Sequence, residues 1–416
     1  MNENINDIRP CKDKPLICVP ITSLVKAGIL DEAGKIADSR ADMAEWRIDY
    51  YAGSQADIPG IISELKSILG SKKLIATLRT EYEGGEENGS GFDYFSVIEA
   101  VINDDTADYV DVEMNRDESR LMELKRLKEG KGIKLIGSYH DFDGMPDKAY
   151  IVQTLTKAKV LGCDVGKIAC MAASEEDAYT MLVATDEIHK TNPDFPLITM
   201  AMGRDGSMTR LYGGLYGSGV TFAALKKASA PGQRSLAEML NVFDKLYASP
   251  GHIFLTGFMG TGKSTIAERI STSYSMPAVD TDDMIEQSTG EKISDIFSKK
   301  GEKRFRKMES DILDELGGLE RSIVSLGGGV VINELNVRKL KLMGTIVWLT
   351  ASPQTIFERV NGSVTRPLLK DNMNVDYISQ LMKARLPMYE ACADVTVDTD
   401  GISVASVARA VMDSVK

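Results

Sequence analysis

Residues 252–265 read HIFLTGFMGTGKST, and this stretch decides the fold of the second half of the chain. An apolar run is followed by a glycine-rich turn and then by residues with the apolar spacing of a helix, which predicts a strand, a tight turn and a helix in succession. Four more strand-like runs alternate with helical stretches after it: MPAVDTD (276–282), RSIVSLGGG (321–329), TIVWLT (345–350) and ADVTVD (393–398). This alternation favours one α/β domain built on a parallel sheet.

Eight strand-like runs, each followed by a stretch of helical period, fill residues 16–225. They are LICVPI (16–21), MAEWRID (43–49), KLIATLR (73–79), YVDVEM (109–114), KLIGSYHD (134–141), DVGKIAC (164–170), PLITMAM (196–202) and GLYGSGVTF (214–222). Eight such units predict a (β/α)8 TIM barrel, whereas a doubly wound open sheet, the alternative, usually has fewer strands. Ser249, Pro250 and Gly251 then interrupt the pattern, so we expect domains at 1–248 and 249–416.

The composition is that of a folded chain. It has 416 residues, 43% of them hydrophobic and 26% charged, and its net charge of -12 argues against nucleic acid and anionic membranes as partners. The five cysteines lack C-x-x-C spacing and the three histidines are scattered, so neither a disulfide framework nor a histidine-rich metal site is indicated. The first fifteen residues lack the apolar core of a signal peptide, and no run approaches about 18 apolar residues. We expect a cytoplasmic protein with no membrane or nucleic-acid partner.

Charged residues alternate with apolar ones along several of the first eight runs. In MAEWRID, Glu45, Arg47 and Asp49 fall on one face of the strand. Helices cover the outside of a barrel, so this polar face should point into the barrel interior or its mouth. The same parity brings further polar pairs to that side, namely Thr77 with Arg79, Asp111 with Glu113, and Ser138 with His140. Each pair alone is explained by a structural ion pair, but together they predict a site at the carboxyl ends of the strands.

Lys167 and His140 carry the chemistry that the barrel site suggests. Lys167 lies in the middle of DVGKIAC on the inward face, where burial would lower its pKa from about 10.4 toward neutrality and leave an amine that attacks a carbonyl. A lysine whose head reaches water, or an ion pair with Glu113, is the simpler interpretation. His140, one strand earlier, favours the reactive amine over these simpler interpretations, because an imidazole beside an imine can remove the proton next to the carbon of the former ketone. On its own, His140 fits a structural hydrogen bond.

Eight short motifs in a fixed order resemble the signature of type I 3-dehydroquinate dehydratase. They are EWRID (45–49), TLRTEYEGG (77–85), VDVE (110–113), GSYHDF (137–142), GCDVGKIA (162–169), MAMGRDG (200–206), TRLYGGLYGS (209–218) and SAPGQ (229–233), and the resemblance covers residues 16–246. It implies a barrel that dehydrates 3-dehydroquinate without a metal or other cofactor. Two positions depart from the common pattern: Pro20 stands where some members carry serine, and Thr209 stands where serine is common.

The same resemblance implies roles for nine residues. Lys167 forms an imine with the substrate ketone, His140 is the general acid and base, and Glu83 orients His140. The residues implied in holding 3-dehydroquinate are Glu45, Arg47 and Arg79 at its hydroxyls, and Arg210, Ser229 and Gln233 at its carboxylate end and the closing loop.

The glycine-rich turn in the second half is a phosphate-binding motif. Gly257–Ser264 fits G-x-x-x-x-G-K-S and lies between a strand and a helix, as the motif requires. Backbone N–H groups would hold phosphates, Lys263 would reach their outer oxygens, and Ser264 would bind Mg²⁺. Asp280 and Asp282 end the next strand on one face and suit magnesium and a substrate hydroxyl, although Asp282 alone also suits a helix cap.

Glycines and arginines complete this second site. Gly327–Gly329 follow a strand, and three residues without side chains let the backbone approach a small ligand closely. Arg306, Arg366 and Arg385 can each grip a carboxylate or phosphate, although single arginines are most often solvated surface charges.

Six motifs of the second half resemble shikimate kinase over residues 250–416. They are GFMGTGKST (257–265), VDTD (279–282), GEKRFRKME (301–309), SLGGGVV (325–331), RPLL (366–369) and RLPMYE (385–390). The resemblance implies a P-loop kinase that uses ATP and Mg²⁺, with Asp282 as its catalytic residue. The implied contacts are Asp282, Arg306, Gly328 and Arg385 for shikimate; Gly260, Thr261, Gly262, Lys263, Ser264, Thr265 and the lid residue Arg366 for ATP; and Ser264 and Asp280 for Mg²⁺.

We therefore expect a bifunctional shikimate-pathway enzyme, a lyase joined to a kinase. The alternatives are a Schiff-base aldolase fused to another small-metabolite kinase, and a non-catalytic regulator that resembles these enzymes. Arg306 paired with Arg385 disfavours the first, and the presence of Lys167 and Lys263 disfavours the second. As partners we expect the small-molecule substrates, a second copy that forms a homodimer through the dehydratase domain, and transient contact with a separate shikimate dehydrogenase.

Overall fold

The computed structural model describes residues 7–10, 13–86, 91–225, 229–248, 250–360 and 374–415. It divides into two compact units, Met1–Asn241 and Val242–Lys416. Among the helices of the described part, none is both long enough and apolar enough to span a membrane.

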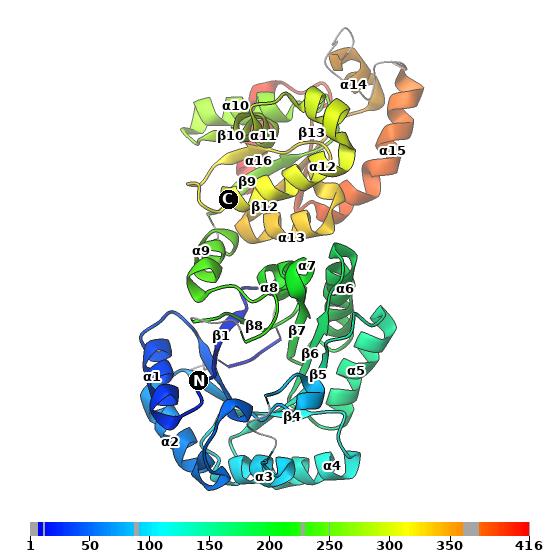
Figure 1. Ribbon diagram of the computed structural model, residues 1–416. Helices are drawn as coiled ribbons and strands as arrows, with labels where there is room; N and C mark the ends of the chain where they lie inside the picture. The colour runs from blue at the N-terminus through cyan, green and yellow to red at the C-terminus, as the bar shows by residue number, and fades with distance from the viewer. Residues whose placement is uncertain are drawn as a thin grey trace. The chain divides into compact units, whose positions relative to one another are not determined.

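Eight parallel strands form a nearly closed barrel in the first unit (Figure 1). They are β1 Leu16–Ile21, β2 Met43–Arg47, β3 Lys73–Thr77, β4 Tyr109–Glu113, β5 Lys134–Asp141, β6 Val165–Met171, β7 Leu197–Met202 and β8 Val220–Phe222, in the spatial order β7-β6-β5-β4-β3-β2-β1-β8. A parallel bridge between Leu197 and Ser218 brings β7 beside the residues that precede β8. The predicted barrel is confirmed, and the open doubly wound sheet is wrong.

Helices connect the strands and cover the outside of the barrel (Figure 1). They are α1 Lys26–Ala37, α2 Ile58–Leu69, α3 Tyr94–Asp104, α4 Glu118–Leu127, α5 Lys148–Val160 and α6 Glu175–Thr191. The short α7 Gly203–Gly206 and α8 Met208–Tyr212 lie between β7 and β8 in the chain, and α9 Leu236–Leu246 follows β8. Their apolar spacing explains the arrangement. In α2, for example, Ile58, Ile61, Ile62, Leu65 and Leu69 are all buried, which is one continuous stripe of a helix that packs on a sheet.

The inward positions of the strands change from apolar to polar toward the carboxyl ends. Ile136 on β5 and Val165 on β6 belong to one apolar cluster inside the barrel, together with Met43, Ile75, Tyr109 and Ile198 from other strands. Two residues further along the same two strands come Ser138 and Lys167. Because inward residues recur every second position, the apolar layer forms a packed floor beneath a polar upper layer.

The second unit is a five-stranded parallel sheet with helices, in the order β10-β11-β9-β12-β13. Its strands are β9 His252–Thr256, β10 Ala278–Asp280, β11 Ile323–Ser325, β12 Gly344–Thr350 and β13 Val395–Asp398. Its helices are α10 Lys263–Tyr274, α11 Thr281–Thr289, α12 Ile293–Leu316, α13 Glu334–Met343, α14 Pro353–Val360, α15 Val375–Cys392 and α16 Val404–Ser414. The chain passes from the central strand β9 to one side of the sheet and later to the other, and ligands of α/β sheets bind where the order reverses in this way.

Candidate active sites

Lys167 lies at the centre of the polar layer of the barrel. Its side chain is 5% exposed, and its Nζ lies 2.9 Å from Asp111 Oδ2 and 3.1 Å from Glu45 Oε1. Burial by itself lowers the pKa of Lys167, yet the attraction of Asp111 and Glu45 outweighs it, so the pKa lies above its usual value. The expected fall of the lysine pKa is therefore wrong for the protein without substrate. Glu113, the ion-pair partner considered for Lys167, bonds to Arg79 and Arg116 instead.

His140 and Glu83 form a close pair beside this lysine. His140 Nδ1 lies 3.0 Å from Glu83 Oε2, and the backbone N–H of His140 donates to the same oxygen at 3.1 Å. Burial, with the charges of Arg79 and Lys167, holds the pKa of His140 well below its usual value. Burial also raises the pKa of Glu83, which reaches about 8 although Arg79 opposes the shift. The imidazole is therefore neutral, as a general base must be.

Two glycines explain how Glu83 reaches this position. Glu83 ends a 3-10 helix, η3 Glu81–Glu83, and Gly84 follows it with φ 80°, a left-handed conformation that favours glycine. A Cβ on Gly84 would lie 2.3 Å from the Phe142 ring, and a Cβ on Gly85 would lie 2.1 Å from the carbonyl oxygen of Arg79. The Gly-Gly pair thus lets the chain turn tightly and aim Glu83 into the barrel.

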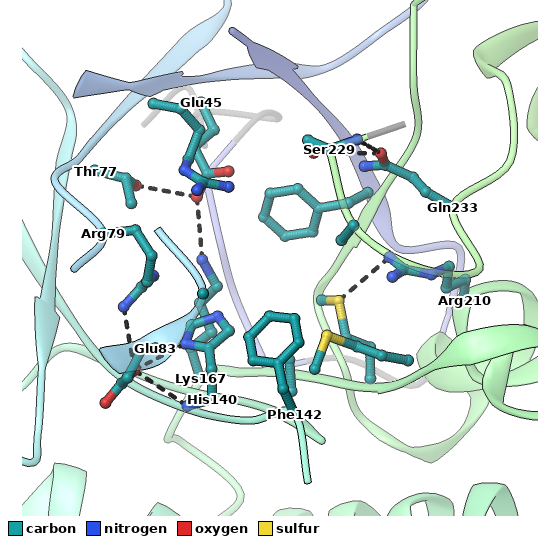
Figure 2. A pocket seen from close by; sticks show the side chains of 17 residues that line it. Glu45, Thr77, Arg79, Glu83, His140, Phe142, Lys167, Arg210, Ser229 and Gln233 are labelled. Atoms are coloured by element: carbon teal, nitrogen blue, oxygen red, sulfur yellow. Dashed lines mark hydrogen bonds and ion pairs between the residues drawn. The ribbon is translucent and has the colours of Figure 1, made fainter. Parts of the chain in front are cut away.

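Nine residues predicted for the barrel site line one cavity (Figure 2), whereas Asp111, Glu113 and Ser138, which were also expected there, are not among its lining residues. The nine are Glu45, Arg47, Arg79, Glu83, His140, Lys167, Arg210, Ser229 and Gln233. Asp49 departs from the expectation that it shares the inward strand face: β2 ends at Arg47, and Asp49 lies in a 3-10 helix, where it bonds to the Arg47 guanidinium at 2.7 and 2.8 Å. The sequence reasoning missed the apolar walls, which are Phe142, Met200, Met202 and Phe222.

Arg210 is a buried cation with no carboxylate partner among the described residues. It is 1% exposed, and it donates to Met200 Sδ and to the carbonyl oxygen of Pro231, both at 3.3 Å. Its Nε has no hydrogen-bond partner in the described part of the chain, and burial lowers the pKa of Arg210 to about 10. Burying an unpaired charge is costly, so the side chain is suited to an anionic ligand that enters the cavity. Ser229 and Gln233 bond to each other nearby (Figure 2).

The turn that follows β9 in the second unit has the form of a phosphate-binding loop. Gly257 has φ 140°, and a Cβ there would lie 2.4 Å from the carbonyl oxygen of Leu349, so only glycine fits. Helix α10 begins at Lys263, whose Nζ donates to the carbonyl oxygens of Gly257 and Phe258 at 2.9 and 3.3 Å. The loop therefore keeps a lysine ammonium at its mouth.

Asp280 links the loop to the next strand. Its Oδ2 accepts a hydrogen bond from Ser264 Oγ at 2.9 Å, and its Oδ1 accepts the backbone N–H of Asp282 at 2.9 Å. Asp280 is thus the N-cap of α11, and the alternative in which Asp282 caps that helix is wrong. A hydroxyl and a carboxylate oxygen side by side are ligands that suit Mg²⁺.

Arg306 and Glu309 form an ion pair on α12 that faces the glycine run. Arg306 Nη1 lies 2.6 Å from Glu309 Oε2, and burial raises the pKa of Glu309 to about 7 although Arg306 opposes the shift. A Cβ on Gly329 would lie 1.9 Å from Arg306 Nη1, and one on Gly327 would lie 2.6 Å from Asp282 Oδ1. The glycines thus make room for the side chains of the site itself. The sequence reasoning missed Glu309, although its spacing of three residues from Arg306 on a helix was a readable signal.

One open cavity is lined by most of the residues predicted for the second site. They are Gly260, Gly262, Lys263, Ser264, Thr265, Asp280, Asp282, Arg306, Gly328 and Arg385. Thr261 is not among them, because its hydroxyl turns back to the carbonyl oxygen of Phe258 at 2.8 Å. Arg366 lies outside the described residues.

Fold and site together define the class of each unit. A buried lysine beside a neutral histidine at the carboxyl ends of barrel strands is the arrangement of an imine-forming enzyme, and a glycine-rich loop with Lys-Ser between strand and helix is that of a P-loop phosphotransferase. The comparisons with known proteins agree. The family model described as type I 3-dehydroquinase matches residues 17–250, and the shikimate kinase model matches residues 259–416. The chain belongs to the type I 3-dehydroquinase family and carries a shikimate kinase domain after it.

Individual relatives extend this result for the barrel. The 3-dehydroquinate dehydratase of Bacillus licheniformis is 37% identical over 236 residues, which are 56% of this chain and 93% of that protein. The crystal structure of the type I 3-dehydroquinate dehydratase from Clostridium difficile, with covalently modified comenic acid, is 34% identical at a TM-score of 0.53 and covers 56% of this chain and 92% of its own. A structure of dehydroquinate dehydratase and shikimate dehydrogenase from S. pombe covers 97% of this chain and 86% of its own at a TM-score of 0.50, and its 17% identity shows a likeness of fold alone.

Proposed function

We propose that the first unit dehydrates 3-dehydroquinate to 3-dehydroshikimate through an imine on Lys167. The observation that carries this proposal is that Lys167, the neutral His140 and Arg210, which has no carboxylate partner among the described residues, all line one cavity. After losing a proton, Nζ attacks the ketone, and water leaves as the imine forms. His140 then takes the proton next to the imine carbon and returns it to the departing hydroxyl, so that a second water leaves. Hydrolysis of the imine frees Lys167 and the enone product.

The remaining barrel residues bind and orient. Glu83 holds His140 through its Nδ1, and Arg210 pairs with the substrate carboxylate near Ser229 and Gln233. Glu45, Arg47 and Arg79 face the substrate hydroxyls. The protonated imine itself withdraws the electrons, so this reaction requires no metal or other cofactor.

The second unit, we propose, transfers the γ-phosphoryl group of ATP to shikimate. The loop amides with Lys263 bind the phosphates, and Thr265 and the backbone of Thr261 belong to the same loop. Asp282 takes the hydroxyl proton of shikimate, while Arg306, Arg385 and the backbone of Gly328 hold its carboxylate end. Arg366 remains an expected ATP contact.

Magnesium fits the pair formed by Ser264 and Asp280. The Ser264 hydroxyl and an Asp280 carboxylate oxygen meet at 2.9 Å beside Lys263 in the phosphate-binding cavity. When bound, Mg²⁺ neutralises charge on the phosphates. The two residues would hold it there.

Wider properties of the chain are also proposals. We place the functional boundary between residues 248 and 249, a position that falls near the end of the dehydroquinase match at residue 250. We propose a homodimer through the dehydratase domain, a cytoplasmic location and transient contact with a shikimate dehydrogenase. The homodimer is tested by light scattering on the full chain, and a monomer at micromolar concentration would contradict it.

Direct assays test the two activities on one sample. Adding 3-dehydroquinate should produce the ultraviolet absorbance of a conjugated enone, and adding shikimate with ATP and Mg²⁺ should release ADP. Lys263→Ala and Asp282→Asn should each cripple the second reaction and leave the first intact. A folded wild-type protein that fails to form the enone would instead favour the aldolase alternative, and failure of both reactions would favour the non-catalytic regulator.

A further inference from the structure

Asp111 is a buried carboxylate on β4 that has no part in the scheme above. It is 1% exposed and is not among the residues that line the barrel cavity, so it does not touch a ligand there. Its Oδ2 lies 2.9 Å from Lys167 Nζ. Its Oδ1 accepts hydrogen bonds from Arg79 Nη2 at 2.7 Å and from Ser138 Oγ at 2.5 Å.

We propose that Asp111 is a positioning residue for Lys167, which anchors Nζ in the unreacted enzyme and accepts the N–H of the iminium after it forms. This inference rests on the proposed imine chemistry. The lysine ammonium has three N–H bonds. One proton leaves when the amine forms, and a second leaves as the nitrogen forms its double bond to carbon. The third survives in the iminium and needs an acceptor, which Asp111 Oδ2 supplies without moving.

Glu45 is unsuited to this task, although it also touches Nζ. Its side chain lines the cavity, accepts a hydrogen bond from Thr77 Oγ1 at 3.0 Å, and faces the space that the substrate enters (Figure 2). A carboxylate that turns to a substrate hydroxyl loses its contact with the lysine. Asp111, in contrast, lies outside the cavity lining, and its Oδ1 accepts hydrogen bonds from Arg79 and from Ser138.

The charges around Lys167 give the proposal a measurable consequence. The groups that face Nζ are Asp111 from β4, Glu45 from β2, Arg79 after β3, His140 from β5 and the Phe222 ring from β8 at 5.0 Å. Burial by itself raises the pKa of Asp111, but Arg79 and Lys167 outweigh it, so the pKa of Asp111 is depressed and the group is ionised. Among the described residues, removing this anion leaves Glu45 as the carboxylate in contact with Nζ, opposed by Arg79. The pKa of Lys167 must then fall.

The test compares Asp111→Asn with Asp49→Asn in the full chain. Asp49 is a matched control, because it is also a fully buried carboxylate paired with an arginine, here Arg47, and its ion pair does not include Lys167. Borohydride trapping of the 3-dehydroquinate adduct on Lys167 is measured against pH by mass spectrometry, alongside kcat and KM of dehydration. For Asp111→Asn the trapping midpoint should move about one unit or more toward acid. Its kcat should fall about tenfold or more, and its KM should change less than kcat. Asp49→Asn should leave the midpoint in place.

Each outcome decides the proposal. An Asp111→Asn enzyme with the wild-type midpoint and kcat overturns it. Absence of a Lys167 adduct in the wild-type protein instead overturns the imine chemistry, so the two failures are distinguishable. If Asp111→Asn does not fold, Ser138→Ala replaces it: this variant loosens Asp111 without removing its charge, so kcat should fall several-fold at an unchanged midpoint, and an unchanged kcat overturns the proposal.

Discussion

Glu83 Oε2 bonds to both nitrogen-bearing groups of His140: the ring Nδ1 at 3.0 Å and the backbone N–H at 3.1 Å. The two contacts fix the imidazole relative to its own strand and leave Nε2 for the cavity. Glu83 therefore sets the orientation of the ring.

Changing Glu83 to glutamine keeps the size of the side chain and replaces its carboxyl group with an amide. Dehydration should slow by about 10- to 100-fold, less than the roughly 10²- to 10⁴-fold expected for His140→Ala, because the imidazole remains but is poorly oriented. Steady-state rates of enone formation measure both variants, and the kinase rate of the same samples is the control. A Glu83→Gln enzyme as slow as His140→Ala would mean that Glu83 does more than orient the ring.

The protonation state of His140 can be observed directly. Burial and the nearby cations lower the pKa of His140, so its neutral form should persist as the pH falls from 7.5 through 6.5. The chain has three histidines, so histidine-selective NMR resolves few signals, and a His140→Gln variant assigns them. A His140 signal that titrates with a midpoint at or above pH 6.5 contradicts the described geometry.

Lys167→Ala should abolish dehydration and leave the kinase rate within a few-fold of wild type, because the residues of the two sites belong to separate units. Borohydride added with 3-dehydroquinate should trap a covalent adduct on Lys167 of the wild-type chain. Recovery of the adduct on a different lysine would remove Lys167 from the mechanism.

Arg306→Ala and Arg385→Ala should each weaken shikimate binding, since each leaves the substrate carboxylate without one of its partners. Both arginines are partly exposed, so a loss of about 1.5 to 3 kcal/mol, typical of a hydrogen bond to a charged group, is expected. The KM for shikimate should rise, and the affinity for ATP should change little. Normal shikimate binding in both variants would mean that the substrate of the kinase is wrong.

The sequence predicted the barrel strands well where their runs were long and apolar. The strands at 16–21 and 134–141 have the predicted bounds, whereas the last run, 214–222, forms a strand only at Val220–Phe222. Its glycines place residues 213–216 in a 3-10 helix, which apolar content alone does not reveal. The error in the predicted bounds of the last strand therefore comes from a local turn.

The site shows the same limit at the level of charges. Inward parity along the strands correctly placed Lys167 and His140 in one cavity. The direction of the Lys167 pKa was wrong because it depends on Asp111, which lies 56 positions earlier in the chain. Apolar walls such as Phe142 were missed for a related reason: Phe142 belongs to the quoted motif GSYHDF, but the identity of an apolar residue does not tell whether it packs in the core or lines a cavity. Sequence patterns do not reveal contacts between residues that are far apart in the chain and come together only in the folded protein.

The most direct test of the whole account is to mix the protein with 3-dehydroquinate, ATP and Mg²⁺. The first reaction yields a ketone, 3-dehydroshikimate, whereas the kinase acts on the corresponding alcohol, so a reduction must intervene. Dehydration should proceed, but shikimate 3-phosphate should form only after a shikimate dehydrogenase and NADPH are added. Formation of shikimate 3-phosphate without them, or its absence once they are present, would contradict the function assigned to at least one of the two units.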